Sequence, residues 1–175
     1  MPIDSTKEFK PINISVLTVS DTRTEATDKS GQILVKKIKE KGHGLTHKQI
    51  VKDEKEEIKK ILLDWCKDKN VDVILATGGT GLTGRDTTPE ALDEIKDKDI
   101  PGFGELFRLI SYKKIGASTI QSRAMAVLVK GTYVFALPGS SGAVTDAWED
   151  ILKFQLDSRF RPCNFIELIP RLNEQ

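Results

Sequence analysis

The sequence has few of the residues that indicate a secreted, membrane-bound or nucleic-acid-coating protein. Its 175 residues include only 2 cysteines and 2 histidines, so neither a disulfide framework nor a histidine-rich metal site is indicated. Lys+Arg 27 against Asp+Glu 26 gives a net charge of +1, which leaves no excess of positive charge to bind nucleic acid. Apolar runs stay far short of the roughly 20 residues that span a bilayer, and residues 1–10 lack the apolar core of a signal peptide. We therefore expect a cytoplasmic protein with no nucleic-acid partner and no membrane partner.

The composition and length are typical of one ordered domain. Hydrophobic residues make up 38% of the chain and charged residues 30%, which is the balance of a folded protein. We expect a flexible N-terminal segment at residues 1–10, a single domain at 11–170 and a C-terminal tail at 171–175. Cys66 is expected in the core, and His43 and His47 at the surface or on a strand.

Apolar runs alternate with amphipathic segments along the chain. Expected strands lie at residues 12–19, 47–51, 71–76, 123–130 and 132–137. Expected helices lie at residues 28–41, 53–69, 101–113 and 141–158, with one more opening at Thr88-Pro89, where Thr88 would be the N-cap. This order predicts an α/β fold: a three-layer α/β/α sandwich with a mostly parallel sheet and a late antiparallel edge hairpin at Lys130-Gly131.

Three loops that follow predicted strands have unusual compositions. They contain Ser20-Asp21, residues 77–88 and residues 138–142, and ligands bind at the carboxyl ends of the strands in such a sheet. The turn Gly78-Gly79-Thr80-Gly81 would let backbone N–H groups approach a phosphate. It matches neither the Walker A nor the GxGxxG pattern, so an ordinary turn remains an alternative.

The loop Pro138-Gly139-Ser140-Ser141 begins the last predicted helix, where the helix dipole favours an anion. An ordinary N-cap by Ser140 or Ser141 is the alternative. Two anion-favouring loops on one edge of the sheet together favour a ligand with a phosphate near each loop.

Two carboxylates are candidates for chemistry. Asp86 lies inside the glycine-rich loop, where it would repel phosphate unless Mg²⁺ lay between them; alternatively it forms a turn or pairs with Arg85. Asp53 precedes a helix with Glu56 three residues on, so a capping box is its alternative role.

These blocks, taken in order, resemble the MoaB/MogA family of molybdopterin-handling proteins. The resemblance rests on residues 18–21, on 77–81 with 85–90, on 101–105 and on 137–140, and it extends over residues 14–165. It implies a three-layer domain that binds molybdopterin, a pterin dithiolene with a terminal phosphate. In the catalytic branch, ATP with Mg²⁺ adenylates that phosphate and releases pyrophosphate.

The resemblance also implies roles for individual residues. Asp53 and Asp86 would be catalytic and would hold Mg²⁺, and the turn from Gly78 to Gly81 would hold nucleotide phosphates. Ser20, Asp21 and the loop Pro138-Gly139-Ser140-Ser141 would line the rest of the pocket. The partners implied are molybdopterin, ATP and further copies of the chain in a trimer or hexamer.

Two alternatives stand beside the adenylyltransferase. Residues 82–85 differ from the corresponding stretch of adenylyltransferases in the family, and some members of this branch bind the pterin without adenylating it. A non-catalytic carrier of molybdopterin or nucleotide is therefore the second hypothesis. A generic nucleotide-binding α/β protein is the third.

Overall fold

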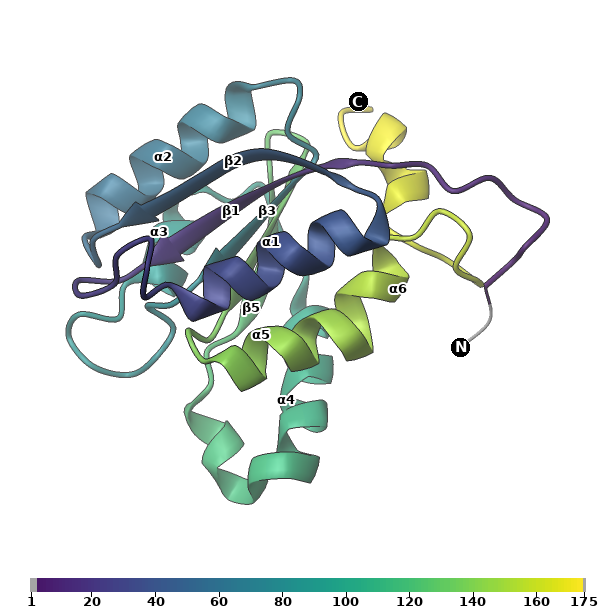
Figure 1. The fold of residues 1–175 in the computed structure, drawn as a ribbon. Coiled ribbons are helices and arrows are strands. Elements are labelled where there is room, and N and C mark those ends of the chain that lie inside the picture. The colour runs from purple at the N-terminus through teal and green to yellow at the C-terminus, as the bar shows by residue number, and fades with distance from the viewer. Residues whose placement is uncertain (1–2, 175) are drawn as a thin grey trace.

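The computed structural model describes residues 3–174, which form a mixed sheet with helices on both faces (Figure 1). Residues 1, 2 and 175, at the ends of the predicted segments 1–10 and 171–175, lie outside the described residues. The strands are β1 (Asn13–Val19), β2 (Gly44–Val51), β3 (Val73–Thr77), β4 (Lys98–Asp99), β5 (Met125–Val129) and β6 (Thr132–Leu137). Their order across the sheet is β2-β1-β3-β6-β5-β4.

Four neighbouring strands pair in parallel, and β5 alone runs in the opposite direction. The strands β2, β1, β3 and β6 run in one direction, whereas β5 is antiparallel to both β6 and β4. The predicted fold class is thereby confirmed, including the hairpin between β5 and β6. The two-residue strand β4, which the sequence did not predict, covers the outer side of β5 and forms the edge.

The helices are α1 (Lys29–Lys41), α2 (Lys55–Lys67), α3 (Thr88–Ile95), α4 (Pro101–Ile115), α5 (Ser141–Ala147) and α6 (Lys153–Gln155). Shorter helical segments are η1 (Gly116–Gln121), η2 (Trp148–Leu152) and η3 (Ile166–Arg171). Because η2 joins α5 directly to α6, the predicted last helix is continuous. None of the helices within residues 3–174 is both long and apolar enough to cross a membrane.

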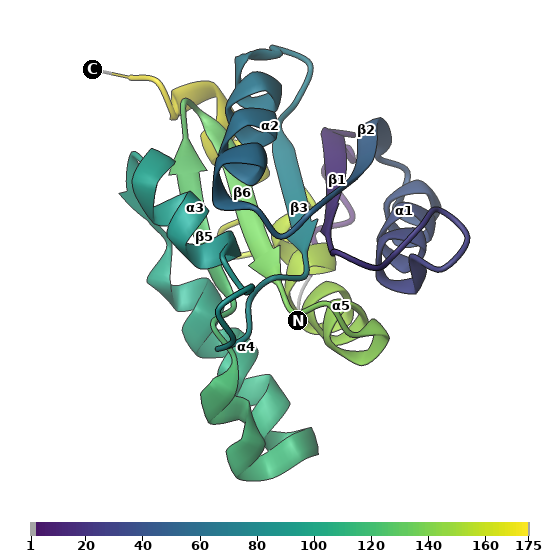
Figure 2. The ribbon, with the colours of Figure 1, turned by 90° about the vertical axis from the view of Figure 1, so that its left-hand side faces the viewer.

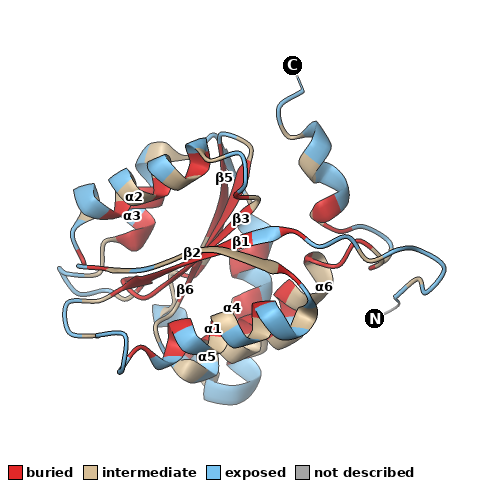
Figure 3. Cartoon of the chain, turned by 45° about the horizontal axis from the view of Figure 1, so that its top comes forward, coloured by how far each residue is buried: buried red, intermediate tan, exposed pale blue. Residues whose placement is uncertain are grey.

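The sheet separates two apolar cores. Ile14 and Val16 of β1 face the layer that contains α1, α4 and α5, whereas Leu17 and Val19 face the layer of α2 and α3. Because successive strand residues point to opposite faces, the nearly unbroken apolar run of β1 fills both cores. Figure 3 shows the buried strands between the two partly exposed helical layers. Helix α4 and η1 extend away from the sheet (Figure 2).

From Ile3 to Lys10 the chain is attached to the C-terminal part of the fold. Ile3 forms a β-bridge with Phe160, and the Asp4 N–H donates to the Arg159 carbonyl over 2.9 Å. The Lys10 N–H donates to Ser158 Oγ, also over 2.9 Å. The described part of the segment predicted to be flexible is therefore held in place by hydrogen bonds.

Predictions about four single residues can be compared with the structure. Cys66 is buried as predicted. The prediction is wrong for His43, which is neither at the surface nor on a strand: it lies just before β2 with 5% of its area exposed, and its ring packs against that of Phe9. His47 lies on β2 as predicted. Thr88 is not the N-cap but the first residue of α3, and its hydroxyl donates to the Gly78 carbonyl over 2.9 Å.

Candidate functional site

A cavity of about 450 Å³ lies at the carboxyl ends of β3 and β6. Its volume is in the range of small-molecule sites. Its walls come from the glycine turn after β3, the loop after β6, helix α4 and the segment that follows η1. The lining residues are Gly78, Gly79, Thr80, Gly81, Asp86, Phe107, Ser111, Ile115, Gln121, Ser122, Pro138, Gly139, Ser140 and Ala143.

Eight of the residues predicted from the sequence line this cavity, and four do not. The eight are Gly78, Gly79, Thr80, Gly81, Asp86, Pro138, Gly139 and Ser140. Ser20, Asp21, Asp53 and Ser141 are absent from the lining. The parallel strands thus bring two of the three predicted loops together at one cavity, and the loop after β1 lies beside it.

The glycine turn has a backbone that only glycine adopts easily. Gly78 has φ +105° and Gly79 has φ +64°, and side chains strongly disfavour such values. A Cβ on Gly78 would lie 2.1 Å from the Val19 carbonyl oxygen, so the turn packs directly against the end of β1. The N–H groups of Gly79 and Thr80 donate to no group within residues 3–174. The turn is therefore packed closely against β1 at Gly78, and the N–H groups of Gly79 and Thr80 are available to bind a phosphate.

Asp53 lies against this turn at Gly79. Its carboxylate accepts the Thr87 N–H over 3.3 Å, and a Cβ on Gly79 would lie 2.7 Å from its Oδ1. The predicted alternative, a capping box for α2, is wrong: Glu54 is the N-cap residue, and it makes no side-chain capping bond. Burial, followed by the charges of Asp86 and Asp21, raises the pKa of Asp53. The carboxylate is thus poorly hydrated and lacks full compensation of its charge.

Asp86 approaches the turn from the cavity side. Its Oδ2 accepts the Thr83 N–H over 2.9 Å and the Thr83 hydroxyl over 2.6 Å, so the carboxylate closes a local turn, as one of its alternatives predicted. Burial acts to raise the pKa of Asp86, but the bonds from Thr83 and Gly81 and the charge of Arg123 together hold it below its ordinary value. Asp86 therefore keeps its negative charge at neutral pH beside the cavity.

Arg85 does not pair with Asp86 but reaches outward to other carboxylates. Its guanidinium donates to both oxygens of Asp21, over 3.0 and 2.8 Å, and to Glu54 over 2.7 Å. Asp21 also accepts the Asp53 N–H over 3.2 Å. These hydrogen bonds, with that of Arg85 the largest contribution, lower the pKa of Asp21. Asp21 thus connects the loops that follow β1, β2 and β3.

The three predicted serines have local places in the structure. Ser20 Oγ accepts the N–H groups of Thr22 and Arg23, both over 3.2 Å, which fixes the loop after β1. Ser140 Oγ accepts the Ala143 N–H over 3.1 Å, so the predicted N-cap alternative is confirmed for Ser140. Ser141 is the first residue of α5.

Helix α4 supplies cavity residues that the sequence did not single out. Phe107, Ser111 and Ile115 share the cavity with the glycine turn. An adjoining cavity of about 320 Å³ shares Ser111, Ile115, Ser140 and Ala143 with the first and continues to Lys114 and Asp146. The two cavities form one groove between α4 and α5. The spacing of apolar residues in this segment predicted a helix that faces the core. It did not indicate that the C-terminal half of the helix lines a groove.

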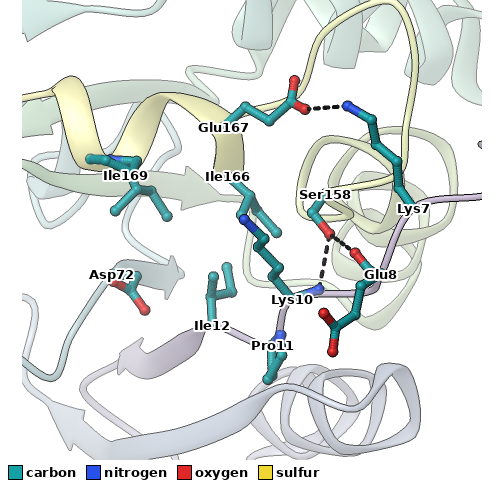
Figure 4. Close-up of a pocket in the computed structure, with 11 residues that line it drawn as sticks. Lys7, Glu8, Lys10, Pro11, Ile12, Asp72, Ser158, Ile166, Glu167 and Ile169 are labelled. Atoms are coloured by element: carbon teal, nitrogen blue, oxygen red, sulfur yellow. Dashed lines mark hydrogen bonds and ion pairs between the residues drawn. The ribbon is translucent and has the colours of Figure 1, made fainter.

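A larger cavity, of about 570 Å³, lies at the opposite ends of the strands (Figure 4). It is bounded by the N-terminal segment, with Lys7 and Lys10, and by the segment around Ile166 and Ile169. None of the residues predicted for the site lines it. Its rim groups are partly paired, since Lys7 contacts Glu167 and the Lys10 N–H contacts Ser158. The groove at the glycine turn is therefore the candidate site.

Comparisons with known proteins show which family the chain belongs to. The family described as "Probable molybdopterin binding domain" matches residues 15–158. Molybdenum cofactor biosynthesis protein B of Escherichia coli (strain K12) is 48% identical over 158 residues, which cover 90% of this chain and 93% of the relative. The chain belongs to the molybdenum cofactor biosynthesis protein B family. The protein of that name from Bacillus cereus is 49% identical over 144 residues, 82% of this chain and 85% of the relative.

Solved structures of this family share the fold. A crystal structure of a molybdenum cofactor biosynthesis protein B superposes with a TM-score of 0.86 at 43% identity, covering 97% of this chain and 100% of the other. The tungsten cofactor synthesizing protein MoaB from Pyrococcus furiosus superposes with a TM-score of 0.74 at 36% identity, covering 82% of this chain and 91% of the other. The implied family membership and fold are confirmed.

Two carboxylates beside the glycine turn fit the small number of protein ligands that Mg²⁺ typically takes. Within residues 3–174, no group of three or more His, Cys, Asp or Glu side chains could hold a metal ion. Asp53 and Asp86 nevertheless adjoin the same glycine turn, and the charge of Asp86 raises the pKa of Asp53. Mg²⁺ typically takes one or two carboxylates and completes its shell with water and substrate phosphates. The chain offers the protein part of such a shell.

Proposed function

We propose that this chain adenylylates molybdopterin in molybdenum cofactor biosynthesis, using ATP and Mg²⁺. The observation that carries the proposal is the placement of Asp53 and Asp86 against one glycine turn in which the N–H groups of Gly79 and Thr80 have no partner in residues 3–174. Membership in the molybdenum cofactor biosynthesis protein B family places the chain in this pathway. The predicted cytoplasmic location fits such a role.

In the proposed reaction, a terminal phosphate oxygen of molybdopterin attacks the α-phosphorus of ATP. A new P–O bond forms between this oxygen and the α-phosphorus. The bond between the α-phosphorus and the oxygen that bridges it to the β-phosphate breaks, and pyrophosphate leaves. Such a transfer depends on positioning the two phosphates and offsetting their charge. The groove, with its two adjoining cavities of about 450 and 320 Å³, offers room for a ligand with two parts.

The residues of the chain would divide this work. The N–H groups of Gly79 and Thr80 would hold phosphate oxygens, and the loop from Pro138 to Ser140 would bound the other side. Asp53 and Asp86 would hold the cation, which would supply charge neutralisation at the transferring phosphate. The pocket roles of Ser20, Asp21 and Ser141 would be indirect, because these residues shape the adjoining loops.

An anaerobic assay with molybdopterin and MgATP, following pyrophosphate and adenylylated pterin, tests the proposal. Asp86→Asn keeps an oxygen that can accept both Thr83 bonds but lacks the charge, so we expect a folded protein without turnover. EDTA should have the same effect. Asp64→Asn, at an exposed residue paired with Lys67 on α2, is the matched control and should retain activity.

The second candidate, a non-catalytic carrier, gives a different result in the same assay. A carrier would bind the pterin tightly and release no pyrophosphate with or without Asp86. That outcome would refute the proposed catalytic role, but the assignment of the chain to molybdenum cofactor biosynthesis would stand.

We also propose that the chain forms a homo-oligomer, a trimer or a hexamer, through α4 and η1. These elements extend away from the sheet (Figure 2) and expose five large apolar side chains. The residues are Leu106, Leu109, Tyr112, Ile115 and Ile120, with exposed fractions from 43% to 83%. Apolar surface of this extent typically marks a protein contact.

A further inference from the structure

The loop that carries Asp86 has no apolar anchor of its own. Residues 82–85 are all exposed, and the single large apolar side chain among them, Leu82, is 68% exposed. A Cβ on Gly84 would meet no atom within 4 Å. The position of the Asp86 carboxylate therefore depends on the polar contacts that hold the two ends of this loop.

Arg123, just before β5, makes those contacts. Its Nε donates to the Gly81 carbonyl over 2.8 Å and its Nη2 donates to the Asp86 carbonyl over 2.8 Å. The same side chain forms an ion pair with Glu90 on α3 through Nη1. Its backbone N–H donates to the Thr80 carbonyl over 3.3 Å. One guanidinium thus bonds both ends of the loop and connects them to the segment before β5 and to α3.

We infer that Arg123 is the positioning residue of this site, which holds the 81–86 loop so that the Asp86 carboxylate lies at the cavity. The inference about metal binding rests on the proposed role of Asp86, whereas the inference about the loop does not. Arg123 itself would contact neither phosphate nor metal. It acts on the backbone whose conformation determines where the Asp86 side chain points.

The geometry assigns this role to Arg123 rather than to Arg85. The side chain of Arg123 is 28% exposed and that of Arg85 is 54% exposed, and exposed ion pairs contribute little. Arg85 also binds carboxylates of residues that are not in the loop, whereas Arg123 binds two backbone carbonyls of the loop itself. A lysine cannot replace this contact, because its ammonium is a single point and the two carbonyls are bonded by different nitrogens of a rigid fork.

The chain offers a matched control in Arg108. Its Nη1 donates to the Ala124 carbonyl over 3.1 Å and to the Ser122 carbonyl over 3.5 Å, so it bonds the residues on either side of Arg123 without touching the loop. If the loop depended only on how the 122–124 segment is anchored, the two arginines would be equivalent. Arg108→Lys therefore separates a general anchoring effect from the specific one.

The first measurement is amide hydrogen exchange in the protein without ligand. The Thr83 and Asp86 amides report the loop, because the first donates to the Asp86 carboxylate and the second to the Thr83 carbonyl over 3.0 Å. In Arg123→Lys we expect both to exchange at least about tenfold faster, as local opening becomes easier. The same amides should be unchanged in Arg108→Lys.

The second measurement is binding of Mn²⁺, as a probe for Mg²⁺, followed by electron paramagnetic resonance. Loss of a group that orients a metal ligand typically weakens binding by about 10- to 100-fold, and we expect that loss in Arg123→Lys. Glu90→Gln weakens one ion pair of Arg123 at the protein surface. It should speed amide exchange of the loop and weaken Mn²⁺ binding, both by less than Arg123→Lys does. This variant also provides the test if Arg123→Lys fails to fold.

The outcomes separate the two proposals. Unchanged exchange of Thr83 and Asp86 in both Arg123→Lys and Glu90→Gln, or equal acceleration in Arg108→Lys, would overturn the role of Arg123. Faster exchange in Arg123→Lys together with no Mn²⁺ binding in the unaltered protein would support the loop role and count against the metal role proposed for Asp86.

Discussion

Protonation of His43 should destabilise this fold between about pH 6.5 and pH 4. The imidazole is buried beside Phe9, and its Nδ1 accepts the Ile12 N–H over 3.3 Å. Its Nε2 is buried without a hydrogen-bond partner among the described residues. Burial, and after it the charge of Lys41, lowers the pKa of His43 from 6.5 to about 4, although Asp157 opposes the shift.

The sign and size of the effect follow from linkage. Above pH 6.5 the imidazole is neutral in both states, so the stability associated with its burial is fully present. As pH falls below 6.5 the unfolded chain binds a proton that the folded chain does not bind until about pH 4, so the free energy of unfolding decreases. A difference of about 2.5 pH units at about 1.4 kcal/mol per unit gives a total loss of about 3.5 kcal/mol. About 3 kcal/mol of it is reached at pH 4, where the folded state is half protonated, and this is large against typical stabilities.

Urea unfolding at several pH values between 7 and 4 measures this loss. His43→Asn keeps a short side chain with an oxygen able to accept the Ile12 N–H but cannot be protonated, so its stability should fall about 3 kcal/mol less over this interval. His47→Gln, at a half-exposed residue paired with Asp68, is the control for a histidine outside the core. Parallel decreases in the unaltered protein and His43→Asn would refute the reasoning.

The remaining predictions concern the glycine turn and the exposed helix. Gly78→Ala forces a side chain into φ +105° with its Cβ 2.1 Å from the Val19 carbonyl oxygen; we expect a loss of at least about 1–3 kcal/mol in urea unfolding. Gly142→Ala, in α5 with no atom within 4 Å of its Cβ, should instead stabilise by up to about 1 kcal/mol, and an equal loss in both would contradict the packing argument. Leu109→Asp should leave the circular dichroism spectrum unchanged and reduce the mass in sedimentation equilibrium; an unchanged mass would show that this part of α4 is not an interface, and Lys113→Glu is the control on the same helix.

Much of the fold could be predicted because the inner strands are covered on both faces. The run of β1 is almost wholly apolar, and it was placed to within one residue at its start. Strand β2 lies at the edge and is only half-buried, so its mixed pattern indicated residues 47–51 and missed its beginning at Gly44. Strand β4 is two exposed charged residues, and it exists only because β5 offers an unpaired edge.

The loops and several residues of the candidate site could be predicted from the sequence, but the contacts between them could not. Gly78, Gly79 and Asp86 stood out because glycines and a carboxylate share one short loop. The capping-box alternative for Asp53 fitted the local spacing equally well, and only the tertiary structure shows its carboxylate against Gly79. Arg123 gave no sequence signal, because its partners are backbone carbonyls more than thirty residues earlier.

The sequence by itself therefore determined the fold class, the family and the identity of the loops that carry polar chemistry. These properties depend on local patterns: apolar periodicity, glycines where φ is positive, and short motifs in a fixed order. The tertiary structure decided which loops meet, that α4 completes the groove, and that one arginine holds the loop of Asp86. Such contacts join residues distant in the chain, and their geometry follows from strand order and packing rather than from neighbouring residues.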